Sequence, residues 1–66
     1  MKIFVNDKEQ NLNGEHSLIH LLSKIMSNTN GIAAAVNNSV VPKTTWEKFQ
    51  LKENDKIIII KATQGG

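Results

Sequence analysis

The chain contains no cysteine, no arginine and no tyrosine, and it has one tryptophan and two phenylalanines among 66 residues. Without cysteine, neither a disulfide framework nor a thiolate metal site can form. The lack of arginine removes the bidentate group that most often reads guanine edges or clamps phosphates. So few aromatic side chains offer no obvious stacking platform for bases. Binding to nucleic acid is therefore not expected.

Long apolar runs are absent as well. No stretch approaches the ~20 residues needed to cross a bilayer. The N-terminal segment Met1–Val5 runs straight into Asn6, unlike the apolar region of a signal peptide. Six acidic residues are scattered among eight lysines, which gives a net charge of +2. We expect one small domain, no membrane partner, and a cytoplasmic location, with a plastid as the alternative compartment.

Two β-hairpins are predicted, each around a pair of turn-forming residues. Residues 2–5 are rich in strand formers and residues 8–12 read as a return strand, with an Asn-Asp pair between them. Residues 32–36 and 39–41 flank an Asn-Asn pair, which accepts positive φ. In the first strand of the second hairpin, Ile32, Ala34 and Val36 are expected on one face, and the small Ala33 and Ala35 on the other.

One amphipathic helix is predicted between the hairpins. Ser17 is a good N-cap for it. Its apolar residues recur at three- and four-residue spacing, and they are Leu18, Leu21, Leu22, Ile25 and Met26. The opposite side carries His20, Ser23, Lys24 and Ser27.

The C-terminal third predicts a helical turn and a final strand. Residues 44–47 fit a capping box, which would direct Trp46 and Phe49 toward the core. Residues 53–55 form an acidic turn. Four consecutive isoleucines at 57–60 suit a strand in the sheet interior that is covered on both faces.

The chain ends in Gly65 and Gly66, directly after the predicted final strand. Bare glycines can pass through a channel too narrow for side chains, and the terminal carboxylate can be activated by another enzyme. The plainer interpretation is a frayed terminus. We expect a folded domain over residues 1–62 and a flexible arm over residues 63–66.

Other candidate sites are weaker. His16 and His20 are four residues apart, but no further metal ligand is evident, so solvated surface histidines are expected. Glu53 and Asp55 are interpreted as a solvated turn. The serines have neither a nucleophile motif nor a base nearby in sequence. No catalytic residue and no metal site are predicted, and the protein is not expected to be an enzyme.

The predicted order of elements is that of the β-grasp fold of ubiquitin, an α+β fold. It has a mixed sheet of about five strands on one main helix, plus a short helical turn. Over essentially its whole length the chain resembles the ThiS family of sulfur carriers, which serve in building the thiazole ring of thiamin. The matching stretches are Lys2–Asn6, Leu21-Leu22, Ala35–Asn37, Val40–Pro42, Trp46, Glu53–Asp55, the isoleucine strand and Gly65-Gly66.

This resemblance implies a specific chemistry at the C-terminus. The carboxylate of Gly66 would be adenylated by a ThiF-type enzyme that uses ATP. A sulfur-transfer enzyme would supply the sulfur that replaces AMP, and the resulting thiocarboxylate would serve a ThiG-type thiazole synthase. Gly65, Gln64 and Thr63 would be recognised by these partners. The chain itself would bind no cofactor.

Three alternatives remain open at this stage. A MoaD-like protein would donate sulfur to molybdopterin, and a ubiquitin-like modifier would be attached to lysines of other proteins. A non-catalytic interaction module would have an inert tail. The first two use the same activated carboxyl group, so the tail does not separate them. By the same resemblance, the exposed sheet face would meet the activating enzyme.

Overall fold

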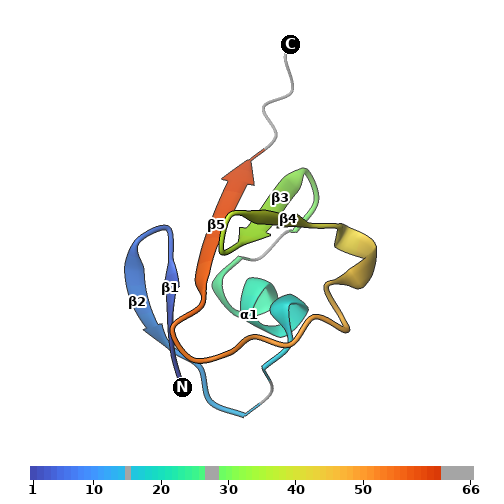
Figure 1. Cartoon of the computed structure of the whole chain (residues 1–66). Coiled ribbons are helices and arrows are strands. Elements are labelled where there is room, and N and C mark those ends of the chain that lie inside the picture. The colour runs from blue at the N-terminus through green and yellow to red at the C-terminus, as the bar shows by residue number, and fades with distance from the viewer. Residues whose placement is uncertain (15, 27–28, 62–66) are drawn as a thin grey trace.

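The computed structural model describes residues 1–14, 16–26 and 29–61, which form one mixed sheet covered on one side by a helix (Figure 1). The elements are β1 (Lys2–Val5), β2 (Lys8–Asn11), α1 (Leu18–Ile25), β3 (Ile32–Val36), β4 (Ser39–Val41), the 3₁₀ turn η1 (Lys43–Thr45) and β5 (Lys56–Lys61). The strand order is β2-β1-β5-β3-β4. β1 and β5 are parallel, and the other neighbours are antiparallel. The predicted α+β β-grasp fold is confirmed.

Both hairpins turn through residues in the left-handed region of backbone conformation. Asn6 and Asp7 have φ of 49° and 68°, and Asn37 and Asn38 have φ of 50° and 71°. Asparagine and aspartate tolerate this conformation better than most residues. The two predicted turns are therefore confirmed. β2 ends at Asn11, one residue earlier than predicted.

The helix begins as predicted but ends before Met26, which was predicted to lie on its apolar side, and Ser27, predicted on the opposite side, lies outside the described residues. The Ser17 hydroxyl accepts a hydrogen bond from the backbone N–H of His20, at 3.3 Å. α1 ends at Ile25, and Met26 already has an extended backbone. Leu18, Leu21 and Leu22 are buried, whereas Ile25 is 37% exposed. The predicted apolar side of the helix thus packs on the sheet along its first two turns.

The capping box predicted over residues 44–47 does not form. η1 starts directly after Pro42, whose φ is −58°, and no side chain caps it. The Thr45 hydroxyl instead donates to the carbonyl of Pro42, at 2.9 Å. Proline fixes φ for a turn that starts here, so the turn begins before Thr44 can act as its cap. Trp46 is nonetheless buried as predicted, and its indole N–H donates to the carbonyl of Val41 at 2.8 Å.

β5 lies in the middle of the sheet, as predicted, but it is not covered on both faces. Ile57 is fully buried and Ile59 is half-buried against the core. Ile58 and Ile60, on the other face, are 36% and 53% exposed. α1 covers only one side of the sheet, and within the described residues no second layer covers the other.

Candidate functional site

The strand that leads to the C-terminus is held unequally by its two neighbours. β3 pairs with β5 over five residues, from Val36 opposite Ile57 to Ile32 opposite Lys61. β1 pairs with it only up to Val5, which lies opposite Ile57. β5 therefore pairs with β3 up to its last residue, whereas on the other side only the first residues of β5 pair with β1.

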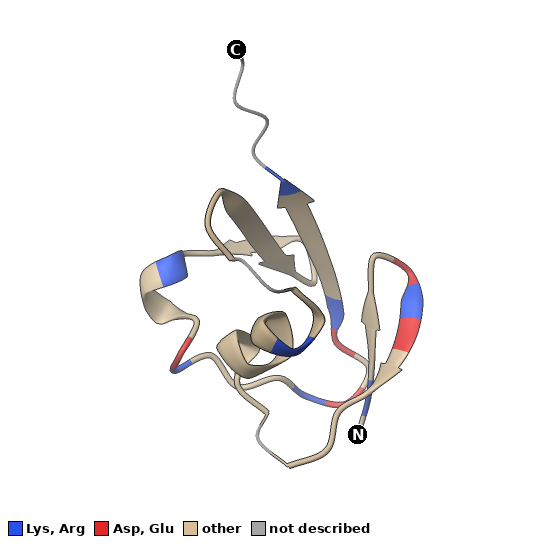
Figure 2. Cartoon of the chain, turned by 180° about the vertical axis from the view of Figure 1, so that it is seen from behind, with Lys and Arg blue, Asp and Glu red and all other residues tan. Residues whose placement is uncertain are grey.

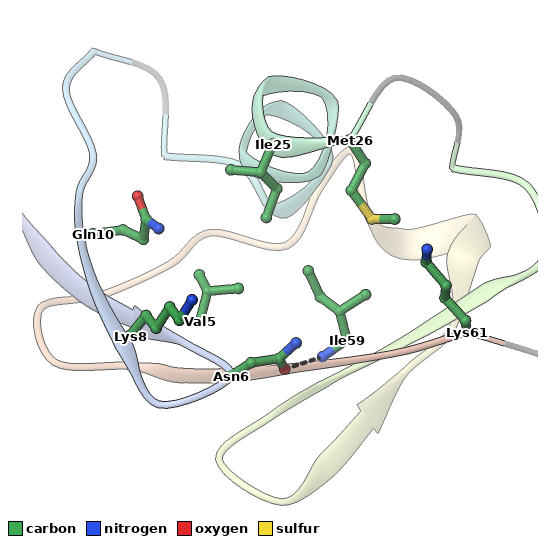
Figure 3. Close-up of a pocket in the computed structure, with 8 residues that line it drawn as sticks. All are labelled: Val5, Asn6, Lys8, Gln10, Ile25, Met26, Ile59 and Lys61. Atoms are coloured by element: carbon green, nitrogen blue, oxygen red, sulfur yellow. Dashed lines mark hydrogen bonds between the residues drawn. The ribbon is translucent and has the colours of Figure 1, made fainter.

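Asn6 extends the contact of β1 with β5 beyond the end of β1. Its backbone N–H donates to the carbonyl of Ile57 at 2.9 Å. Its side-chain Oδ1 accepts from the backbone N–H of Ile59, also at 2.9 Å (Figure 3). The sequence predicts Asn6 as a turn residue and as part of a stretch that matches the family, but it does not predict this role.

The start of β5 is fixed by a second asparagine and a buried carboxylate. Asn37 accepts from the backbone N–H of the first residue of β5 at 3.0 Å, and its Nδ2 donates to Asp55 at 2.9 Å. The other Asp55 oxygen accepts from the backbone N–H of Lys52 at 2.8 Å. The prediction of solvated carboxylates is thus wrong for Asp55, which is 9% exposed. Glu53 is exposed, yet its carboxylate accepts from the backbone N–H of Lys2 at 3.0 Å.

The side of the sheet away from α1, here named the open face, is largely apolar. In register, Ala35 lies opposite both Ile58 and Val40, and Ala33 lies opposite Ile60. Val40 is 71% exposed. β5 carries charge only at its two ends, and β3 and β4 carry none (Figure 2). Exposed apolar side chains that gather on neighbouring strands are typical of interaction surfaces.

The predicted site residues Thr63, Gln64, Gly65 and Gly66 lie outside the described residues, together with Ala62. The structure places the end of β5, Lys61, directly before them. The chemistry implied at Gly66 therefore stays a prediction.

The weaker candidates do not assemble into a site. His16 lies in the loop before α1, where its carbonyl accepts from the backbone N–H of Leu51 at 2.8 Å. Across residues 1–14, 16–26 and 29–61, no three His, Asp or Glu side chains are grouped so that they could hold a metal ion. In the same part of the chain, no helix is long and apolar enough to span a membrane.

Within the described residues, the strand order and the helix that covers one side of the sheet define a protein of the ubiquitin-like β-grasp class. The ThiS family model matches residues 2–66, and the chain belongs to the ThiS family. The predicted resemblance is confirmed.

Relatives and solved structures that are similar to this chain include the following four. The sulfur carrier protein ThiS of Escherichia coli K12 is 26% identical over 66 residues, covering all of both chains. The uncharacterized protein ycf40 of Trieres chinensis is 32% identical over 63 residues, covering 96% of this chain and 86% of that protein. The crystal structure of the thiamine biosynthesis protein ThiS of Geobacter metallireducens superposes with a TM-score of 0.85 at 20% identity, covering all of both chains. A solution structure of a thiamine biosynthesis protein from that organism gives 0.75 at 20% identity, covering 100% of this chain and 88% of that one.

Proposed function

We propose that this protein is a sulfur carrier that holds sulfur as a thiocarboxylate on Gly66 and donates it for the thiazole ring of thiamin. The observation that carries this proposal is a family match that extends through the terminal glycine, over residues 2–66. The name of the Escherichia coli relative, which aligns over its full length, points the same way. The proposal places the protein in the cytoplasm or in a plastid.

The proposed chemistry begins with activation of the C-terminus. The Gly66 carboxylate attacks the α-phosphorus of ATP, and pyrophosphate leaves with the electron pair of the broken bond. Sulfur at the oxidation level of sulfide then attacks the acyl carbon, and AMP leaves. Activation is needed because the oxygen of a free carboxylate is a poor leaving group, whereas AMP is a good one. Attachment to a folded protein lets the partner recognise a large surface and position the sulfur.

In this proposal the chain is a cosubstrate and not an enzyme. Gly66 carries the sulfur, Gly65 keeps the arm slender, and Gln64 and Thr63 line the arm inside the partner enzymes. ATP binds to the activating enzyme. No residue of this chain is required to move a proton or to hold a cofactor.

The proposed partners are a ThiF-type adenylating enzyme, a sulfur-transfer enzyme and a ThiG-type thiazole synthase. The open face supports contact with the adenylating enzyme because its exposed Ile58, Ile60 and Val40 have no covering layer within the described part of the chain. Small Ala33 and Ala35 on that face permit close approach.

Substitution at Gly65 tests the proposal directly. A Gly65→Trp variant is expected to reduce ATP-dependent pyrophosphate release by the ThiF-type enzyme at least about tenfold, because the ring obstructs correct placement of the carboxylate. A Lys24→Trp variant, on the exposed side of α1, serves as the matched control and should react normally. Unchanged reaction of Gly65→Trp would refute a narrow channel.

Deletion of Gly65 and Gly66 separates a carrier from an inert-tail module. The carrier proposal requires that this deletion abolish pyrophosphate release, while the folded domain keeps its stability. A deleted chain that still supports thiamin synthesis would show that the tail is dispensable.

A further inference from the structure

β5 continues past the point where β1 leaves the sheet, and this exposes part of its edge. Backbone groups of Asp55 and Ile57 point toward β1, since their carbonyls accept from β1 and Asn6. Strand residues alternate in the side to which they present N–H and C=O groups. The Ile59 carbonyl and the Lys61 N–H therefore also face this side. Within the described residues no strand pairs with them there, and β5 runs beyond the β1–β2 hairpin (Figure 1).

A cavity of about 440 Å³ lies beside this free edge, on the side of the sheet that carries α1. Val5 and Ile59 project into it from the sheet, and Ile25 projects toward them from the end of the helix (Figure 3). Ile25 is 37% exposed, so the cavity is open to a ligand from solvent. We name this cavity, together with the free edge of β5, the edge groove.

The edge groove has a positive charge toward each end. Lys8 lies opposite Val5 in the β1–β2 pairing and lines one end, and Lys61 lines the other. Its remaining lining residues are Asn6, Gln10 and Met26, so no acidic residue lines it within the described part of the chain. An apolar floor between two cations complements a ligand with an apolar centre and negative ends.

We propose that the edge groove binds an extended segment of a partner protein, which adds to β5 as a further strand. Backbone groups of the segment would pair with the Ile59 carbonyl and the Lys61 N–H, and its alternate side chains would face the groove. The side chains of the segment that face the groove would be acidic, apolar and acidic, in that order along the segment. A second copy of this chain does not fit, because its edge strands, KEQN in β2 and SVV in β4, lack this pattern.

This site differs from the open face because it lies on the opposite side of the sheet. It extends to Lys61, the last residue that the structure describes. The inference does not depend on sulfur chemistry at Gly66. If the groove binds no such segment, the carrier proposal still stands, and if Gly66 carries no sulfur, the groove proposal still stands.

The test is an NMR titration of the full-length protein with a blocked five-residue peptide of sequence glutamate-serine-valine-serine-glutamate. We expect saturable shifts of the Lys61 amide and of the Val5 and Ile25 methyl groups. The double variant Lys8→Glu, Lys61→Glu should weaken binding at least about fivefold at low salt, because two exposed attractive contacts become repulsive. Lys56→Glu, on the same strand but the opposite face, is the matched control and should leave the affinity unchanged.

Three results would overturn the proposal. The first is the absence of saturable shifts at millimolar peptide. The second is an equal response to a peptide in which lysines replace both glutamates. The third is displacement of the peptide by AMP at similar concentrations, which would make the groove a small-molecule site.

Discussion

Two asparagines close gaps in the hydrogen-bonding of the sheet on either side of β5. Asn6 and Asn37 both have a left-handed backbone, with φ of 49° and 50°. Each uses its side-chain oxygen to accept from a backbone N–H of β5, at 2.9 Å from Ile59 and 3.0 Å from Lys56. A side chain here replaces the ladder bond that a turning backbone no longer provides. The two residues thus fix both the beginning and the middle of the strand.

The contribution of the Asn6 side chain to the free energy of unfolding can be separated from the free-energy cost of its left-handed backbone. Asn6→Ala should lower the free energy of unfolding by about 0.5 to 1.5 kcal/mol more than Asn38→Ala, because only Asn6 loses a bond to β5. Asn38 is a suitable control because its φ of 71° imposes similar strain on alanine. Urea denaturation measures both values, and hydrogen exchange should accelerate at the Ile59 amide only in Asn6→Ala. Equal losses in the two variants would show that the side-chain bond adds nothing.

At the residue scale, the sequence predicts the roles of residues that shape the backbone around them. It does not predict the roles of residues that bond to distant parts of the chain. The asparagine turns were predictable, because tolerance of positive φ is a property of the residue itself. The bond from Asn6 to Ile59 spans 53 positions, and that from Asn37 to Asp55 spans 18. No local pattern encodes such pairings, so Asp55 was expected in solvent although it is buried.

At the scale of elements, β5 shows how pairing decides what a side chain does. Residues 57–60 are four identical side chains, so composition gives no alternation by which to separate the faces. The register with β1 and β3 places Ile57 in the core and Ile60 on the open face. A continuous apolar run predicted a central strand correctly, but it predicted cover on both faces incorrectly.

Two substitutions in β5 test this difference between a buried and an exposed isoleucine. Ile57→Ala should reduce the free energy of unfolding by about 2 to 5 kcal/mol, because it leaves a cavity in a fully buried site. Ile60→Ala, in the same strand and with the same atoms removed, should change it by about 0.5 kcal/mol or less. Chemical denaturation gives both values. Comparable losses at the two positions would contradict an uncovered open face.

For the remaining elements, the outcome of the prediction depends on whether nearby residues alone determine where the element begins. Helix spacing from Leu18 and the Ser17 cap were sufficient to place α1. The capping-box motif at 44–47 failed because Pro42 starts the turn earlier, so a neighbouring residue outweighed the motif. Burial of Trp46 was still predicted correctly, because it depends on the side chain more than on where the turn begins.

At the scale of the whole molecule, the fold brings two surfaces together around the end of one strand. The open face lies on one side of β5 and the edge groove on the other, and the chain leaves the described structure at Lys61 between them. The order of elements was predictable because turn residues separate them clearly. The exposed sheet face was also expected, but the residues that form it were not, because they depend on strand register. The edge groove was not expected, because it depends on where β1 ends.

The central claim is that Gly66 carries sulfur, and intact-mass spectrometry of the protein purified from its own cells tests it most directly. We predict a fraction that is heavier by the difference between one sulfur and one oxygen atom, and fragmentation should localise this difference to Gly66. This fraction should disappear when the gene for the activating enzyme is removed. A C-terminus that stays an ordinary carboxylate under thiamin starvation, in cells with the activating enzyme present, would contradict the account.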